Sequence, residues 1–369
     1  MKTSKMQKTR AYNFSAGPAT LPESILLEAR AELLNWHGLG LSVMEISHRS
    51  APFQAIMEEA EALLRTLLAI PDHYHVLFLG GAARTQFAMI PMNLLSSASQ
   101  AAYLISGCWS SMAYKEACRL KKAYCVGTSE PSHFTTLPDA HVDALLPDTK
   151  YLYYTPNETI NGVRFPNVPV CGTVPLVADM TSCLLSEPIN VADYGLIFAG
   201  AQKNIAPAGL TVVIVRSDLL ENAADPVIPT MLDYRTHTAN HSSYATPPTF
   251  NCYMAGKMFH WIKAQGGVHA LYQHNCEKAA KLYQFIDASS FYHCSVATDA
   301  RSIVNVCFTL SQPDRTDEFV KQALRRGLYG LKGHALVGGL RASLYNAMPM
   351  AGVNALIAFM GEFSDDYSD

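Results

Sequence analysis

The stretch YGLIFAGAQKNIAPAGLTVVIVR (194–216) contains two apolar runs that flank a loop of small residues, and Lys203 lies just beyond the first run. Short apolar runs bounded by such residues are typical of buried strands. In open α/β sheets, ligands bind beyond the carboxyl ends of the strands. Lys203 is therefore predicted to point into a ligand-binding crevice, although the segment alone also allows a surface lysine in a turn.

Apolar runs of the same kind alternate with helical patterns from about residue 22 to residue 265. We predict strands at 74–79, 101–106, 174–179, 194–200 and 210–215, and helices at 24–36 and 53–70. Such alternation is typical of a mostly parallel sheet covered by helices.

The C-terminal third of the chain has a different order of patterns. We predict two helices at 247–264 and 268–287, and then a strand, a helix, a strand and a helix at 303–310, 317–327, 340–345 and 353–363. This block is typical of a smaller α+β domain. We therefore expect an N-terminal segment that packs with the small domain, a large ligand-binding domain and the small domain itself, at residues 1–22, 23–266 and 267–369.

Composition narrows the class of protein. Of the 369 residues, 49% are hydrophobic and 16% are charged, which supports a large buried core. The net charge of −3, without a basic block, favours neither nucleic acid nor a membrane surface as a partner. The nine scattered cysteines contain no CxxC pair, and the N-terminus has no apolar signal region. We expect a soluble cytoplasmic protein with reduced thiols and no metal site.

Two of the predicted crevice residues carry distinctive chemistry. Partial burial of Lys203 would disfavour its ammonium form and leave an amine that can condense with an aldehyde. Asp179 ends the strand at 174–179, so it would lie at the same edge of the sheet. A carboxylate there could pair with a protonated pyridine nitrogen, although it could also cap a following helix.

Two further features favour a phosphorylated aromatic ligand. GGAARTQ (80–86) lies between a strand and a helix, where backbone N–H groups can bind a phosphate, but it matches neither the P-loop nor the Gly-x-Gly-x-x-Gly pattern. Trp109 follows the strand at 101–106, where its indole could stack on a ring. Trp109 could equally be a core residue.

Together these residues resemble the phosphoserine aminotransferases, which are class V enzymes of fold type I that use pyridoxal 5′-phosphate (PLP). The resemblance covers nearly the whole chain. Its matching segments are NFSAGPATLP (13–22), GLGLSVMEISHRS (38–50), TPNETINGV (155–163), AGAQKNIAPAGLT (199–211), TPPTF (246–250) and LKGHALVGGLRASLYNAMP (331–349). It implies a large α/β domain with a mostly parallel sheet, a smaller α+β domain, and PLP as the cofactor.

The resemblance also implies roles for individual residues. Lys203 resembles the catalytic lysine that holds PLP as a Schiff base, and Asp179 resembles the partner of the pyridine nitrogen. The other implied cofactor contacts are Ala83, Arg84, Trp109, Thr159, Gln202 and Thr246, the last from the second subunit of a homodimer with shared active sites. The implied substrate contacts are His48, Arg49, Arg84, His334 and Arg341. Among these, Arg341 would hold the α-carboxylate, because a guanidinium fork suits a carboxylate.

The implied reaction transfers the amino group of L-glutamate to 3-phosphohydroxypyruvate and gives O-phospho-L-serine and 2-oxoglutarate. A related phosphorylated 2-oxo acid on the route to vitamin B6 is a possible second substrate, with 4-phosphohydroxy-L-threonine as product. The partners are thus small molecules.

The chain departs from the family pattern in three places. Ala335 stands where the family has a phosphate-binding arginine, and a charge-assisted contact of that kind is typically worth roughly 1.5–3 kcal/mol. Ala245 stands where the family has an asparagine. Ala82 and Ala83 stand where the family has glycines in the phosphate loop; alanine can still donate its backbone N–H, but it disfavours positive φ. The main alternative is therefore an aminotransferase of the same fold with a different amino-acid substrate.

Two further alternatives remain open. A cysteine desulfurase shares the fold but needs a mobile, reactive cysteine, for which Cys294 and Cys307 are poor candidates. A binding protein without turnover is the third possibility. The pairing of Lys203 with Asp179 argues against it, because simple binding needs no imine-forming amine beside an acid.

Overall fold

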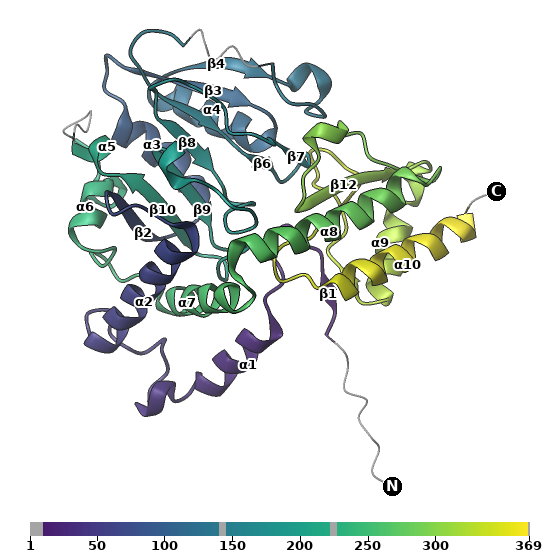
Figure 1. Cartoon of the computed structure of the whole chain (residues 1–369), viewed down its shortest axis with the longest axis horizontal. Helices are drawn as coiled ribbons and strands as arrows, with labels where there is room; N and C mark the ends of the chain where they lie inside the picture. Colours follow the sequence, from purple (N-terminus) through teal and green to yellow (C-terminus); the bar gives the residue numbers. More distant parts are fainter. Residues whose placement is uncertain (1–9, 140–144, 222–226, 368–369) are drawn as a thin grey trace.

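The computed structural model describes residues 10–139, 145–221 and 227–367. Its main element is a seven-stranded sheet in the order β2–β10–β9–β8–β5–β3–β4 (Figure 1). The strands are β2 (Tyr74–Gly80), β3 (Gln100–Ile105), β4 (Lys122–Thr128), β5 (Thr149–Tyr154), β8 (Leu176–Asp179), β9 (Leu196–Gly200) and β10 (Leu210–Arg216). β10 is antiparallel to β2 and β9, and the other neighbouring pairs are parallel. The predicted mostly parallel sheet is confirmed.

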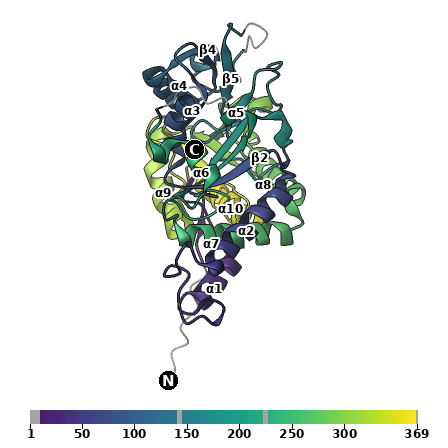
Figure 2. The same cartoon turned by 90° about the vertical axis from the view of Figure 1, so that its left-hand side faces the viewer.

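Helices cover both faces of this sheet (Figure 2). On one face lie α2 (Ala51–Leu68) and α7 (Thr249–Ala264), and on the other lie α3 (Gln86–Leu94) and α4 (Cys108–Leu120). The alternation of side chains along a strand is visible in β2, because Val76 and Phe78 join the core under α2 and α7, whereas Leu77 and Leu79 join the core under α3 and α4. The two buried faces explain why these strands read as continuous apolar runs.

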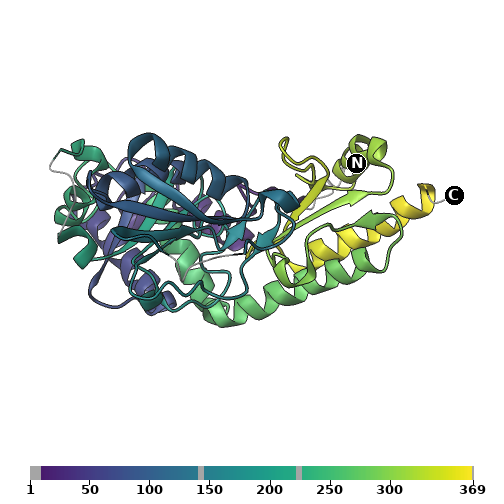
Figure 3. The same ribbon diagram turned by 90° about the horizontal axis from the view of Figure 1, so that it is seen from above.

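A second core lies in the C-terminal part of the chain. The antiparallel strands β11 (Tyr292–His293), β12 (Asn305–Leu310) and β14 (Leu340–Ser343) pack with α8 (Gly267–Asp287), α9 (Thr316–Arg325) and α10 (Met350–Tyr367). Phe319 lies at its centre, wholly buried, with the rings of Phe359 and Phe363 4.9 and 5.0 Å away. We call the part with the seven-stranded sheet the large lobe and the part with this second core the small lobe. Figure 3 shows α8, in green, running from the large lobe along the small one.

The N-terminal segment lies against this second core. β1 (Tyr12–Asn13) pairs in parallel with β13 (Leu328–Tyr329), and the wholly buried Phe14 belongs to the C-terminal core. The hydroxyl of Tyr345 donates to the carbonyl of Ala16 at 2.8 Å. The smaller elements are α1 (Glu23–Glu32), β6 (Asn157–Glu158), β7 (Val163–Arg164), α5 (Asp218–Glu221) and α6 (Tyr234–Ala239).

Several bounds differ from those that the sequence pattern predicts. The first helix ends at Glu32, and residues 33–50 form turns and a short 3-10 helix at Trp36–Gly38. The edge strand β4 and the inner strand β5 have no counterpart among the predicted strands, and β5 is rich in tyrosines that read as partly polar. In the fold they are buried, and the hydroxyls of Tyr103 and Tyr151 are 3.0 Å apart. No helix in the described part of the chain is long and apolar enough to cross a membrane.

Candidate active site

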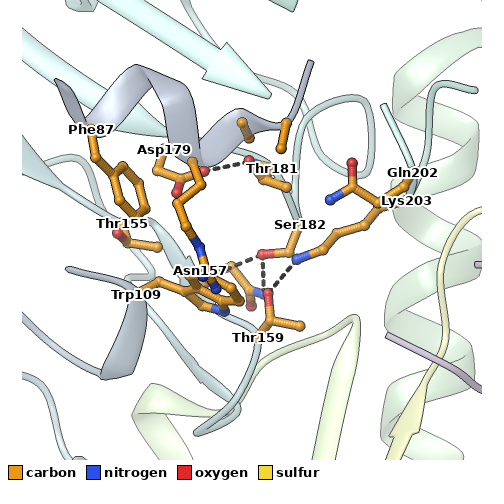
Figure 4. A pocket seen from close by; sticks show the side chains of 13 residues that line it. Phe87, Trp109, Thr155, Asn157, Thr159, Asp179, Thr181, Ser182, Gln202 and Lys203 are labelled. Carbon is orange, nitrogen blue, oxygen red and sulfur yellow. Dashed lines mark hydrogen bonds between the residues drawn. The ribbon is translucent and has the colours of Figure 1, made fainter. Parts of the chain in front are cut away.

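A cavity of 340 Å³ lies at the carboxyl edge of the large sheet. Because β2, β3, β5, β8 and β9 point in the same direction, the loops that follow them meet there. The lining residues are Ala82, Ala83, Arg84 and Phe87 after β2, Trp109 after β3, Thr155, Asn157 and Thr159 after β5, Asp179, Thr181 and Ser182 at β8, and Gln202 and Lys203 after β9 (Figure 4). Residues more than 120 positions apart thus share one wall.

Lys203 has the environment of a reactive amine. Its side chain is buried, and Nζ donates to the hydroxyl oxygen of Thr159 at 2.5 Å (Figure 4). Burial lowers the pKa of Lys203 to about 8, while Asp179 acts in the opposite direction. A lysine in this state carries much more free amine at neutral pH than an exposed one. It is therefore not the surface lysine that the segment alone also allowed.

Asp179 ends β8 and is buried in the same cavity. One carboxylate oxygen accepts a hydrogen bond from the backbone N–H of Thr181 at 2.9 Å. Burial raises the pKa of Asp179, and the bond from Thr181 and the charge of Lys203 act against that rise. The residues after Asp179 form turns rather than a helix. Asp179 therefore caps a local turn, and it lines the cavity as well.

The loop after β2 shows how the chain tolerates its two alanines. The single positive φ in this loop, +118°, falls on the retained Gly81. Ala82 is extended, and Ala83 begins a 3-10 turn that leads into α3. The first N–H groups of a helix have no acceptor within it, so the amides of Ala83 and Arg84 can serve an anion. The replacements leave the predicted phosphate-binding geometry possible.

Trp109 and Thr155 line the cavity, and each has a buried polar atom without a hydrogen-bond partner among the described residues. Trp109 lies in the first turn of α4, with the guanidinium carbon of Arg84 5.0 Å from its ring centroid. The indole Nε1 and the hydroxyl of Thr155 are buried without a hydrogen-bond partner among the described residues. Buried polar groups usually have partners. The cavity fits a planar phosphorylated pyridine aldehyde such as PLP. It offers a flat indole for the ring, an amine for the aldehyde, a carboxylate for the ring nitrogen and the start of a helix for the phosphate.

An arginine and a histidine from the small lobe lie beside this cavity. Nη1 of Arg341, on β14, donates to the carbonyl of Thr159 at 3.3 Å, and its Nε is buried without a partner in the described part of the chain. His334 lines a smaller cleft together with Arg341. Partial burial, together with the charges of Arg341 and Arg84, lowers the pKa of His334. The fold thus gathers Arg84, His334 and Arg341 around one anion-accepting space.

Besides His334 and Arg341, which line the neighbouring cleft, three more predicted site residues do not line the cavity of this chain. Arg49 is exposed just before α2, and Nε2 of the half-buried His48 has no hydrogen-bond partner in the described ranges. Thr246 lines a separate hollow of 210 Å³ beside Gly80 and Gln86.

The sequence pattern did not single out Phe87, Thr155, Asn157, Thr181 or Ser182, which all line the cavity. Four of these residues follow β5 or β8. Polar residues directly after a buried strand are the one sequence signal that could have identified them.

The cysteine desulfurase alternative loses support from the burial of its candidates. Burial raises the pKa of the Cys307 thiol to about 12, and it also raises the pKa of Cys294. A reactive cysteine needs a lowered pKa and access to substrate.

Comparison with known proteins agrees with this geometry. The Aminotransferase class-V family matches residues 11–356. A phosphoserine aminotransferase of Legionella pneumophila (strain Lens) is 62% identical over 97% of this chain and 99% of its own length.

Two solved structures extend this likeness. Phosphoserine aminotransferase from Bacillus circulans subsp. alkalophilus has a TM-score of 0.94 and 45% identity, over 97% of this chain and 99% of its own. The PLP-bound enzyme from Trichomonas vaginalis has a TM-score of 0.91 and 40% identity, over 95% of this chain and 100% of its own. The chain therefore belongs to the class-V aminotransferase family. Within that family it groups with the phosphoserine aminotransferases, and PLP is the cofactor of this family.

We expect the Lys203 amine of the apoprotein to react with cyanate at a rate that rises with pH around a midpoint of about 8, because burial lowers its pKa. At pH 7 about one tenth of such amines are neutral, against roughly one in 2,500 for an ordinary lysine with a pKa of about 10.4. Mass spectrometry of the Lys203 peptide after short exposures would measure this, with a free lysine peptide as control. A midpoint that matches the free peptide would contradict the expectation.

Proposed function

We propose that this chain is a PLP-dependent phosphoserine transaminase, which transfers the amino group of L-glutamate to 3-phosphohydroxypyruvate. The products are O-phospho-L-serine and 2-oxoglutarate, and the step belongs to serine biosynthesis. The observation that carries the proposal is the buried Lys203 amine in one cavity with Asp179, beside the cations Arg84 and Arg341 and the imidazole of His334. The 62% identity to an enzyme of that name supports the choice of substrate.

Different cavity residues would hold different parts of the cofactor. PLP, when bound, supplies an electron-withdrawing ring that stabilises negative charge on the α-carbon of an amino acid. Lys203 would hold the aldehyde carbon, Asp179 the pyridine nitrogen and Trp109 one face of the ring. The turn at Ala83 and Arg84 would hold the phosphate with its backbone N–H groups. Thr159 and Gln202 would complete the contacts.

Lys203 also has the properties of a general base. A group is most effective in this role when its pKa lies near the working pH, and burial lowers the pKa of Lys203 to about 8. Its Nζ can therefore take up a proton from the substrate α-carbon and release it again. Thr159 orients this nitrogen through its hydroxyl oxygen.

The two arginines and His334 account for the two substrates. Arg341 would bind the α-carboxylate through its planar guanidinium, and its buried, unpartnered Nε is available for such a contact. Arg84 and His334 would bind the second anion, which is a phosphate in one substrate and a side-chain carboxylate in the other. Since both groups are anionic, one site can serve glutamate and the phosphorylated substrate in turn, as a ping-pong reaction requires.

We also propose a homodimer with shared active sites. In it, Thr246, His48 and Arg49 would act in the cavity of the other copy, which is compatible with their position outside the cavity of their own chain. Apolar side chains exposed in the segment that precedes Arg49, including Leu34 and Met44, support an interface there. A cytoplasmic location is proposed as well, and the nine unpaired cysteines support it.

A second activity towards the phosphorylated 2-oxo acid that yields 4-phosphohydroxy-L-threonine is proposed on the same grounds, because the anion-binding residues would receive its phosphate. The alternative is a different amino-acid substrate, which Ala335 would explain. Ala335 lies exposed in the loop between His334 and β14.

We expect purified protein with PLP to convert glutamate and 3-phosphohydroxypyruvate into 2-oxoglutarate and phosphoserine. Lys203→Ala should lose at least about a thousandfold in kcat, since general-base and nucleophilic functions are removed together. Lys321→Ala, an exposed lysine of α9, is the control and should keep wild-type rates. Product formation followed by mass spectrometry measures both. A wild-type protein that transaminates other amino acids but not phosphoserine would overturn the substrate assignment.

We expect Arg49→Ala and Lys203→Ala chains, each inactive or weak alone, to regain activity when they are assembled together. In a hybrid dimer with shared sites, the cavity of the Arg49→Ala chain keeps Lys203 and receives Arg49 from its partner, so one of the two sites is complete. Activity of hybrids purified through two different tags measures this. Hybrids no more active than the parents would show that Arg49 serves its own chain or no site at all.

We expect Ala335→Arg to raise kcat/KM for phosphoserine by about tenfold or more, because a charge-assisted contact is typically worth roughly 1.5–3 kcal/mol. Leu336→Arg places the same charge on the neighbouring exposed residue and is the matched control. Steady-state kinetics of both variants would separate a specific contact from general attraction. Equal gains in both variants, or none, would show that position 335 does not face the phosphate.

A further inference from the structure

Glu158 is a wholly buried carboxylate of β6 that does not belong to the lining of the cavity. It accepts three hydrogen bonds, all from the first turn of α4. One oxygen accepts from the backbone N–H of Trp109 at 3.0 Å, and the other accepts from the N–H and the hydroxyl of Ser110 at 2.8 and 2.6 Å. Glu158 therefore holds the start of a helix that precedes it by about fifty residues in the chain.

The local sequence of α4 explains why it needs this partner. The residue before the helix is Gly107, which has no side chain to cap the free N–H groups. The segment 157–161 supplies the caps instead, since the N–H of Cys108 also donates to the side-chain oxygen of Asn161 at 3.1 Å. A negative charge at a helix N-terminus is favourable. Burying a carboxylate is nevertheless a costly way to cap a helix, which suggests a purpose beyond stability.

Gly107 makes the approach of this carboxylate possible. A Cβ at position 107 would lie 2.4 Å from Cδ of Glu158 and 2.7 Å from one of its oxygens. Real Cβ atoms do not approach other atoms that closely. The backbone there is extended, so the requirement for glycine comes from space alone.

The bonds of Glu158 connect two walls of the cavity. Glu158 accepts a hydrogen bond from the N–H of Trp109, whose indole forms one wall of the cavity. The residue after Glu158 is Thr159, whose hydroxyl orients Lys203. Glu158 therefore links the indole wall to the loop that orients the Lys203 amine, and the contact of Asn161 with Cys108 is a second link between the same segments.

We propose that Glu158 is a positioning residue for the cofactor, which holds Trp109 against the ring of PLP, and that Gly107 is required to admit it. This inference rests on the proposed function in two respects, the binding of PLP in this cavity and the stacking of Trp109 on its ring. It does not depend on which amino acid the enzyme uses.

The test measures PLP binding and the position of Trp109 in Glu158→Gln. An amide keeps one acceptor but turns an N–H₂ group towards the helix N–H groups, so the turn should loosen. We expect the Kd for PLP to rise at least tenfold and the visible circular dichroism of bound PLP to weaken. In a Trp36→Phe/Trp261→Phe background, the fluorescence of Trp109 in the apoprotein should become more accessible to acrylamide. Unchanged values in these measurements would overturn the proposal.

The matched control is Glu187→Gln, which makes the same change in a half-buried carboxylate paired with Arg164, away from the cavity. It should bind PLP like the wild type. A loss of affinity equal to that of Glu158→Gln would assign the effect to general destabilisation and overturn the proposal. Thermal unfolding of each apoprotein accompanies the binding data.

A double-mutant cycle tests the same contact if Glu158→Gln does not fold. Gly107→Ala should weaken PLP binding because its Cβ displaces the carboxylate, and Gly107→Ala/Glu158→Ala should be no weaker than Glu158→Ala alone. Additive losses, or failure of all these variants to fold, would make Glu158 a purely structural residue. If the wild type binds PLP but does not transaminate phosphoserine, the proposed function fails while the role of Glu158 is still decided by these affinities.

Discussion

A primary amine persists in a protein interior only where hydrogen-bond partners replace water and where part of its charge can be lost. Lys203 satisfies both conditions, since it donates to Thr159, and burial lowers its pKa to about 8. Those conditions exist because parallel strands bring the ends of β5, β8 and β9 to one edge. The sheet thereby creates the polar, water-poor space in which this amine can react, and the remaining site residues are arranged around it.

The residues that we propose as substrate contacts come from two lobes, so the lobes must be joined accurately. Buried polar contacts supply this connection. Asn157, in the cavity wall, donates to the side chain of Asn305 on β12 at 2.8 Å, and Asn305 donates to Ser343 on β14 at 3.0 Å. Ser343 lies two residues from Arg341, which reaches back to the carbonyl of Thr159. Such a network is directional, unlike apolar packing, and it therefore fixes Arg341 relative to the reactive lysine.

The departures of this chain from its family have different consequences in the fold. The alanines of the phosphate loop are harmless to the backbone, because the residue with positive φ is the retained Gly81. Ala335 lies in an exposed loop beside His334, at the position where the family pattern has an arginine. The environment of the Lys203 amine is thus separate from these departures, whereas in our proposal the recognition of phosphate depends on Arg84 and His334.

The sequence by itself determined the strands that end at Asp179 and Gly200, because apolar periodicity is a local property, and it determined the family through long matching segments. It also predicted Lys203 at the carboxyl edge of the sheet, where the fold places it. Only the tertiary structure decided that Thr155 and Asn157 line the cavity, that Arg49 does not, and that Glu158 caps a helix far from it in the chain. These contacts join residues that are distant along the sequence, so no local pattern records them.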